Sequence, residues 1–340
     1  MRQRHLVFGR ETTQNESGNM QMNIVSALNN ALDLAMAENN KMVLLGEDIG
    51  KDGGVFRVTD GLLSKYGESR VIDTPLAESS IVGTAVGMAI GGLLPVPELQ
   101  FAGFMYLAFS QIVNHVARYR ARTRSSITLP MIIRTPVSGG VRTLEHHSES
   151  PEVEYAHIGG LTVVEPSNPY DAKGLMLAAA HGKDPVIFLE PTKLYRLFKQ
   201  EVPENMYEVP IGKAKVIKEG NDLTIITYGT MVNVVSNVVE KRKLSAQVVD
   251  LITINPLDEK TIIESAKKTG RVLIVHEAPL SFGVGAEISA RIAEKAIFEL
   301  DAPIIRVAAP SLPYPLPGDE NFYVPNEIKV SKAIDKLLSV

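Results

Sequence analysis

The chain has 340 residues, enough for two or three domains with a substantial buried core. Its net charge of −4, with 22% charged residues of both signs, excludes a strongly basic nucleic-acid-binding protein, and no run of about 18 apolar residues predicts a membrane span. The absence of cysteine excludes disulfides, cysteine-ligated metals and thiol catalysis, and it fits an intracellular protein.

Residues 1–18 lack the apolar core of a secretory signal and are predicted to form a polar tail. Apolar residues then recur at three- and four-residue spacing over 21–40, which predicts an amphipathic helix, and 41–46 follows as a strand. Further strands are predicted at 70–74, 94–99, 131–135, 161–165 and 185–190. Helices are predicted from 78 to 92, from about 103 to 120 and from about 168 to 181.

A second, shorter alternation of strands and helices follows. Residues 199–212 contain two prolines and several charges, so they are predicted to be a linker, and 213–340 form the second unit. The first unit is therefore 19–198. Alternation of this kind predicts an α/β fold of two three-layer units with mostly parallel sheets.

Glu78 stands at the junction between the strand at 70–74 and a helix rich in small residues, including Gly83, Gly87 and Gly91. Glycines at these positions let another backbone or a ligand approach closely. A glutamate in the first helical turn either complements the helix dipole or directs its carboxylate at a cofactor heteroatom.

The segment between the strands at 131–135 and 161–165 is polar and glycine-rich, and it contains His146 and His147. Long polar segments of this kind in a folded domain are commonly functional. A histidine there can exchange protons near neutral pH.

Four segments together resemble the beta subunit of the thiamine-diphosphate-dependent decarboxylating component of 2-oxo acid dehydrogenase complexes, of the pyruvate and branched-chain types. The resemblance covers roughly 19–340 and implies a thiamine-diphosphate pyrimidine-binding domain followed by a transketolase C-terminal-like domain. The segments are GEDIGKDGGVFRVTDGL at 46–62, DTPLAESSIVGTAVG at 73–87, HHSESPEVEYAHIGGLTVVEPSNPYDAKG at 146–174 and PVIFLEPTKLYR at 185–196.

The resemblance implies that Glu78 bonds a ring nitrogen of the cofactor's aminopyrimidine, favours its imino tautomer and so helps to activate the thiazolium carbon. Phe104 corresponds to an aromatic residue that stacks on the aminopyrimidine; a core aromatic on an amphipathic helix is the alternative. Gln100 is expected to approach the cofactor or a water, or else to satisfy backbone groups at a strand end.

The resemblance also places His147 on the histidine that faces the substrate and helps transfer the acyl group to lipoamide, with His146 as its loop neighbour. Arg142 either steers an anionic substrate or is an exposed loop arginine. Glu47 lies where the family has a glutamate in a proton-relay path between two cofactors; a strand-end carboxylate is the alternative.

The chain lacks the Gly-Asp-Gly sequence that binds the diphosphate through a divalent metal in thiamine-diphosphate enzymes, and Gly318-Asp319-Glu320 has the wrong third residue. The resemblance therefore implies that an alpha subunit supplies the diphosphate site and magnesium. A potassium site made of backbone carbonyls is expected near 131–135 and 178–185, where side chains give no signal.

The implied function is decarboxylation of a 2-oxo acid by thiamine diphosphate, shared with the alpha subunit in an α2β2 heterotetramer. Reductive acylation of lipoyl groups on an acyltransferase core would follow. The segments HHSESPE and LEPTKLYR favour a branched-chain substrate over pyruvate. The expected location is the cytoplasm or an organelle matrix. A split transketolase-like enzyme and a noncatalytic assembly subunit are the two alternatives.

Overall fold

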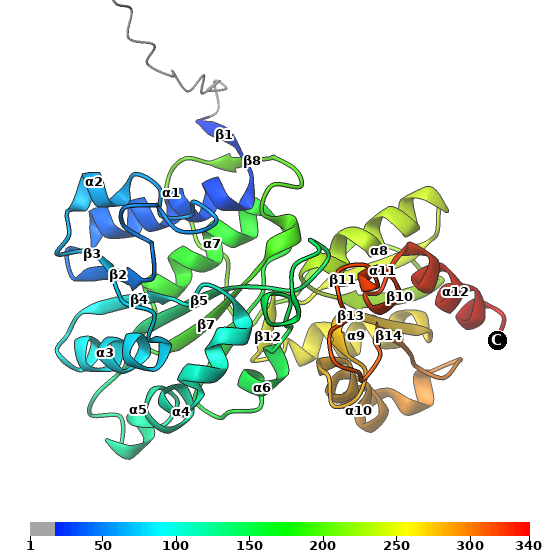
Figure 1. The fold of residues 1–340 in the computed structure, drawn as a ribbon. Helices are drawn as coiled ribbons and strands as arrows, with labels where there is room; N and C mark the ends of the chain where they lie inside the picture. The colour runs from blue at the N-terminus through cyan, green and yellow to red at the C-terminus, as the bar shows by residue number, and fades with distance from the viewer. Residues whose placement is uncertain (1–17) are drawn as a thin grey trace, which may run out of the picture.

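The computed structural model describes residues 18–340, which form two α/β units side by side (Figure 1). The tail predicted at 1–18 lies outside the described residues except for Gly18. The predicted fold class is confirmed: each unit has a mostly parallel sheet with helices on both faces.

The first unit is built on a seven-stranded sheet with the order β12-β6-β7-β5-β4-β2-β3. All neighbouring pairs are parallel except β12 and β6. In chain order the strands are β2 (Met42–Gly46), β3 (Val71–Asp73), β4 (Leu94–Glu98), β5 (Met131–Val137), β6 (Thr162–Val164), β7 (Pro185–Pro191) and β12 (Thr253–Asn255).

Two helices, α1 (Ile24–Glu38) and α7 (Pro169–Ala180), cover one face of this sheet, and α3 (Glu78–Ile90) covers the other. Successive residues of the central strands face opposite layers, so Leu44 packs with α1 and α7 whereas Leu45 packs with α3. This double burial explains the nearly continuous apolar strand sequences. Local signals fix the helix starts, since Asn23 caps α1 and Asn168 caps α7.

The helix predicted at about 103–120 is wrong in form, because the segment is divided into four short pieces. A 3₁₀ segment (Ala102–Ala108) precedes one α-helical turn, α4 (Phe109–Gln111), a π-helical turn (Ile112–Val116) and α5 (Tyr119–Arg122). The amide of Phe104 bonds the carbonyl of Phe101 at 3.0 Å, an i to i+3 contact that tightens the first turn. Apolar periodicity does not distinguish these pitches over one or two turns.

The second unit has a five-stranded sheet with the order β14-β13-β10-β11-β9, in which only β9 is antiparallel to its neighbour. Three of its elements, β9 and the last two helices α11 and α12, were not predicted from the sequence. The strands are β9 (Lys215–Lys218), β10 (Leu223–Thr227), β11 (Ala246–Asp250), β13 (Val272–Pro279) and β14 (Ile305–Ala309). The helices are α8 (Thr230–Lys241), α9 (Glu259–Thr269), α10 (Val284–Ala296), α11 (Glu320–Tyr323) and α12 (Glu327–Leu338).

Two segments that come after the first unit in the chain, one from the linker and one from the second unit, form strands with the first unit. Part of the segment predicted as a linker is a strand, β8 (Gln200–Pro203), which pairs antiparallel with β1 (Asn19–Met22). The buried Lys173 of α7 donates to the carbonyls of Pro203 (2.5 Å) and Glu204 (2.9 Å) and holds this segment against the first unit. In addition, β12 of the second unit forms the edge strand of the first sheet, next to β6.

Within residues 18–340, no helix is both long and apolar enough to cross a membrane.

Candidate active site

The residues predicted to carry function gather at one edge of the first sheet. Glu47 directly follows β2, Glu78 begins α3 soon after β3, and Gln100 lies two residues after β4. His147 lies in a 3₁₀ turn (Glu145–His147) between β5 and the short helix α6 (Glu152–Ala156). Because these strands are parallel, their carboxyl ends share one edge, the usual place for a ligand in an open α/β sheet.

Glu47 and Glu78 are two buried carboxyl groups at this edge. Their exposed fractions are 2% and 8%, and both carboxyl oxygens of Glu47 are buried without a hydrogen-bond partner. Burial raises the pKa of Glu47 to about 7, with further contributions from the charges of Glu78 and Asp48. A buried, unpaired carboxyl group is costly, so this pair fits a bound group that presents a nitrogen or a proton.

Aromatic rings surround the two histidines of the site. The ring of His147 is 4.2 Å from that of Phe101 and 5.5 Å from that of Phe104, measured between centroids. Phe104 also lies 5.6 Å from His146, and Phe101 contacts Phe56 at 5.6 Å. Phe104 therefore flanks the histidines, and its stacking on an aminopyrimidine stays a prediction.

His147 has the features of a proton-transfer group. Its Nδ1 atom is buried without a hydrogen-bond partner. Burial, and then the neighbouring His146, lower the pKa of His147 below its usual value, which favours the neutral imidazole at pH 7. His146 is half-exposed and lies 3.6 Å from the Glu145 carboxylate, as expected for a loop neighbour.

Gly103 makes the close approach of the histidine turn possible. A Cβ atom at this position would overlap the carbonyl oxygen of His146. Only glycine leaves enough room for the two backbones, so the 3₁₀ segment and the histidine turn are packed directly against each other.

Two of the predicted residues have contacts that the sequence did not indicate. Gln100 donates from Nε2 to the carboxylate of Asp48 at 3.0 Å, so it joins the ends of β4 and β2. The side chain of Arg142 is exposed, while its backbone amide donates to Glu320 of the second unit at 3.2 Å. Neither a steering role for Arg142 nor a cofactor contact for Gln100 is tested by this geometry.

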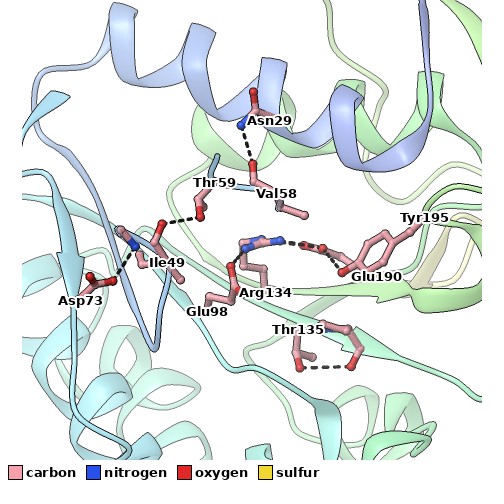
Figure 2. A network of polar contacts seen from close by, with 12 residues as sticks. Asn29, Ile49, Val58, Thr59, Asp73, Glu98, Arg134, Thr135, Glu190 and Tyr195 are labelled. Atoms are coloured by element: carbon pink, nitrogen blue, oxygen red, sulfur yellow. Dashed lines mark hydrogen bonds and ion pairs between the residues drawn. The ribbon is translucent and has the colours of Figure 1, made fainter. Parts of the chain in front are cut away.

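A buried ion-pair network under the site was missed by the sequence analysis. Figure 2 shows Arg134 of β5 between Glu98 of β4 and Glu190 of β7. The guanidinium bonds both oxygens of Glu190, at 2.7 and 2.8 Å, and pairs with Glu98; Tyr195 donates to Glu190 at 2.6 Å. The only sequence signal was a single charge in each of three otherwise apolar strands. The network fixes the ends of the strands that lead to Gln100 and to the histidine loop.

The described part of the chain contains no cluster of three or more histidine or acidic residues that could hold a metal ion. Near the turn where a potassium site was expected, Arg120 forms an ion pair with Asp184. The potassium site stays a prediction.

Comparisons with known proteins agree with this architecture. Residues 20–197 match the family described as "Transketolase, pyrimidine binding domain", and residues 212–330 match "Transketolase, C-terminal domain". A solved structure of a split-gene transketolase, an inactive beta4 tetramer, superposes with a TM-score of 0.77 over 94% of this chain and 98% of its own. Its sequence identity is 23%, so this likeness shows the fold alone.

Three relatives of similar length each carry the name "Pyruvate dehydrogenase E1 component subunit beta". The protein of Acholeplasma laidlawii is 50% identical over 317 residues, which cover 92% of this chain and 97% of the relative. That of Staphylococcus epidermidis is 48% identical over 90% of this chain and 95% of its own length. That of Mycoplasma genitalium is 48% identical over 94% and 99%.

Fold and domain order thus define a protein with a transketolase-type pyrimidine-binding domain followed by a transketolase C-terminal domain. The resemblance found in the sequence is confirmed at the level of the family. The chain belongs to the family of beta subunits of thiamine-diphosphate-dependent 2-oxo acid dehydrogenase components.

Proposed function

We propose that this chain, together with an alpha subunit, decarboxylates a 2-oxo acid with thiamine diphosphate and transfers the acyl group to lipoyl groups of an acyltransferase core. The observation that carries the proposal is the buried Glu47 and Glu78 pair, with both Glu47 oxygens unpaired, at the strand edge that also presents His147. The assembly would be an α2β2 heterotetramer in the cytoplasm. The alpha subunit would hold magnesium and the diphosphate.

Pyruvate is the substrate we propose first. The relatives at 48 to 50% identity are named as pyruvate dehydrogenase subunits, which supports pyruvate ahead of the branched-chain acids that two sequence segments favoured. Residues of the alpha subunit would complete the pocket, so the substrate is best decided by assay.

The residues at the strand edge fit thiamine diphosphate. Glu78 would hold the aminopyrimidine ring through a ring nitrogen, and Phe104 would lie along the ring face. When bound, the cofactor supplies a carbon nucleophile for the 2-oxo acid. The unpaired oxygens of Glu47 provide an acceptor next to Glu78, which an aminopyrimidine or a water bound to it would satisfy.

Each side chain then has a defined task. Glu78 would exchange a proton with the ring nitrogen of the bound cofactor. Glu47, with a pKa of about 7, can take up or release a proton near neutral pH. His147, neutral at its lowered pKa, accepts or donates a proton at Nδ1 or Nε2 during acyl transfer. Phe101 and Phe104 exclude water around the histidine.

The test is to prepare the complex with its alpha subunit and compare Glu78→Gln with wild type, adding thiamine diphosphate, magnesium and either pyruvate or branched-chain 2-oxo acids. We expect Glu78→Gln to lower decarboxylation by about 100-fold or more, because glutamine cannot exchange the proton. Assembly with the alpha subunit should be retained. The exposed Glu68 offers a matched control, and Glu68→Gln should keep wild-type activity.

Three results would overturn parts of this proposal. A fully active Glu78→Gln complex would indicate a noncatalytic assembly subunit. Ketol transfer to aldehydes without any need for lipoamide would indicate a transketolase-like enzyme. Full activity of this chain alone would contradict the shared site.

A further inference from the structure

The loop that carries the two histidines is tied to the second domain near its start. This loop, 138–150, connects β5 to α6. The amide of Gly139 donates to Glu277 Oε1 at 2.5 Å, and the amides of Gly140 and Arg142 donate to Glu320 Oε1 at 2.8 and 3.2 Å. Glu277 belongs to β13, and Glu320 is the first residue of α11, so both acceptors come from the second domain.

Glu320 is the centre of this connection. It is 3% exposed, and its Oε1 also accepts the hydroxyl of Tyr314 at 2.7 Å. The tyrosine lies so close to the loop that a Cβ on Gly139 would overlap its hydroxyl oxygen. A buried carboxylate must be satisfied by hydrogen bonds, and here two loop amides and Tyr314 provide them. The contact therefore fixes the loop backbone and not only a side chain.

Bonds inside the loop relay this restraint to the histidine turn. The amide of Ser138 donates to the carbonyl of Glu149 at 2.9 Å, which closes the base of the loop. The hydroxyls of Thr143 and Ser148 lie 2.8 Å apart, on either side of the turn that holds His147. Fixing 139–142 therefore limits the positions that His147 can reach.

We infer that Glu320, supported by Tyr314, is a positioning residue that holds His147 against Phe101 for acyl transfer. The inference rests on the proposed role of His147, and it gives the second domain a part in the site through the loop backbone. A purely structural role for Glu320 would instead lower the stability of the second domain and leave the loop unchanged.

The experiment compares hydrogen–deuterium exchange of 138–150 in the complex with its alpha subunit, for wild type and Glu320→Ala. Loss of the carboxylate should speed exchange of the Gly140 and Arg142 amides about tenfold, as expected when a hydrogen bond to a charged group is lost. Glu320→Gln keeps an acceptor oxygen and should give a smaller change. The exposed Glu294 provides the control, since Glu294→Ala should leave loop exchange unchanged.

Lipoyl reduction is measured on the same variants, together with His147→Ala and the double variant. If Glu320 acts through His147, Glu320→Ala should lower kcat for lipoyl reduction, and it should cost little more in a chain that already carries His147→Ala. If Glu320→Ala does not fold, the same measurements are made on Glu320→Gln and on Tyr314→Phe, which removes one hydroxyl.

Unchanged loop exchange in Glu320→Ala would overturn the inference, and so would losses that multiply in the double variant. Full lipoyl reduction by His147→Ala would instead contradict the proposed role of His147. The exchange rates would still decide, independently, whether Glu320 holds the loop.

Discussion

Gly103 is the residue at which the smallest change should disturb the site. Adding one methyl group forces the His146 carbonyl and the 3₁₀ segment apart. We expect Gly103→Ala to lower the free energy of unfolding by about 1 to 3 kcal/mol, as overpacking does. It should also lower lipoyl reduction, because His147 moves away from Phe101. Denaturant unfolding and steady-state kinetics on the same preparation measure both effects.

Gly159 is the matched control for that substitution. It lies between α6 and β6, and a Cβ there would meet no heavy atom within 4 Å. Gly159→Ala should therefore change stability and kinetics little. Equal effects of the two substitutions would show that the close approach at Gly103 is unimportant.

For single residues, the sequence predicted which side chains lie at strand ends better than it predicted the contacts that these side chains make. Glu47 and Glu78 could be placed because each stands beside a recognisable strand, and parallel strands end at one edge. The contact of Phe101 with His147 could not be predicted, since it depends on where a loop some 45 residues later returns. The bond from Gln100 to Asp48 likewise joins two strand ends that are distant in the chain.

Among the elements, the three central strands β4, β5 and β7 are held together by the side chain of one arginine, Arg134. Replacing Arg134 with methionine leaves Glu98 and Glu190 buried without their cation. We expect Arg134→Met to cost about 3 to 5 kcal/mol of unfolding free energy, the usual result of removing one partner of a buried pair. Chemical denaturation of the purified chain measures this.

The exposed Arg118, which bonds Asn114, is the control for Arg134. Arg118→Met should change stability by less than about 0.5 kcal/mol. A similarly small effect of Arg134→Met would mean that the two glutamates take up protons or water at little cost, against the expectation.

Long apolar runs made most strands and helices predictable. The elements that were missed are short or have sequences in which apolar and charged residues are mixed. β2, β5 and β7 are buried on both faces and read as mostly apolar segments, with one charged residue in each of β5 and β7. β1, β8 and β12 have three or four residues each, and their pairing partners are distant in the chain, so no local period reveals them. The segment 103–120 has the apolar pattern of one helix, whereas the structure divides it into four short pieces.

For the molecule as a whole, Glu152 should make stability depend on pH. This residue of α6 is fully buried and accepts the hydroxyl of Tyr228 from the second domain at 2.6 Å. Burial raises the pKa of Glu152 to about 8, from 4.5 in the unfolded chain. Between these values the folded protein holds a proton that the unfolded chain releases, so stability falls as the pH rises from about 4.5 to 8.

We expect Glu152→Gln to reduce this dependence and to raise Tm at pH 8 by about 2 °C or more, since the amide carries no charge and still accepts from Tyr228. Calorimetry between pH 5.5 and 8.5 makes the measurement. The exposed Glu264 serves as control, with Glu264→Gln keeping the wild-type slope. An equal slope in wild type and Glu152→Gln would contradict the assignment.

The strand β12 also has a consequence for the order of synthesis. The partners of β6 on this strand, Thr253 and Asn255, lie about 90 residues beyond Val163 and Val164. On a ribosome adding about 5 to 20 residues per second, the edge of β6 stays open for roughly 5 to 20 seconds after β6 itself is made. During that interval its unpaired backbone is available to other chains. The nascent first domain is thus exposed to misassembly until about a third of the second domain has been translated.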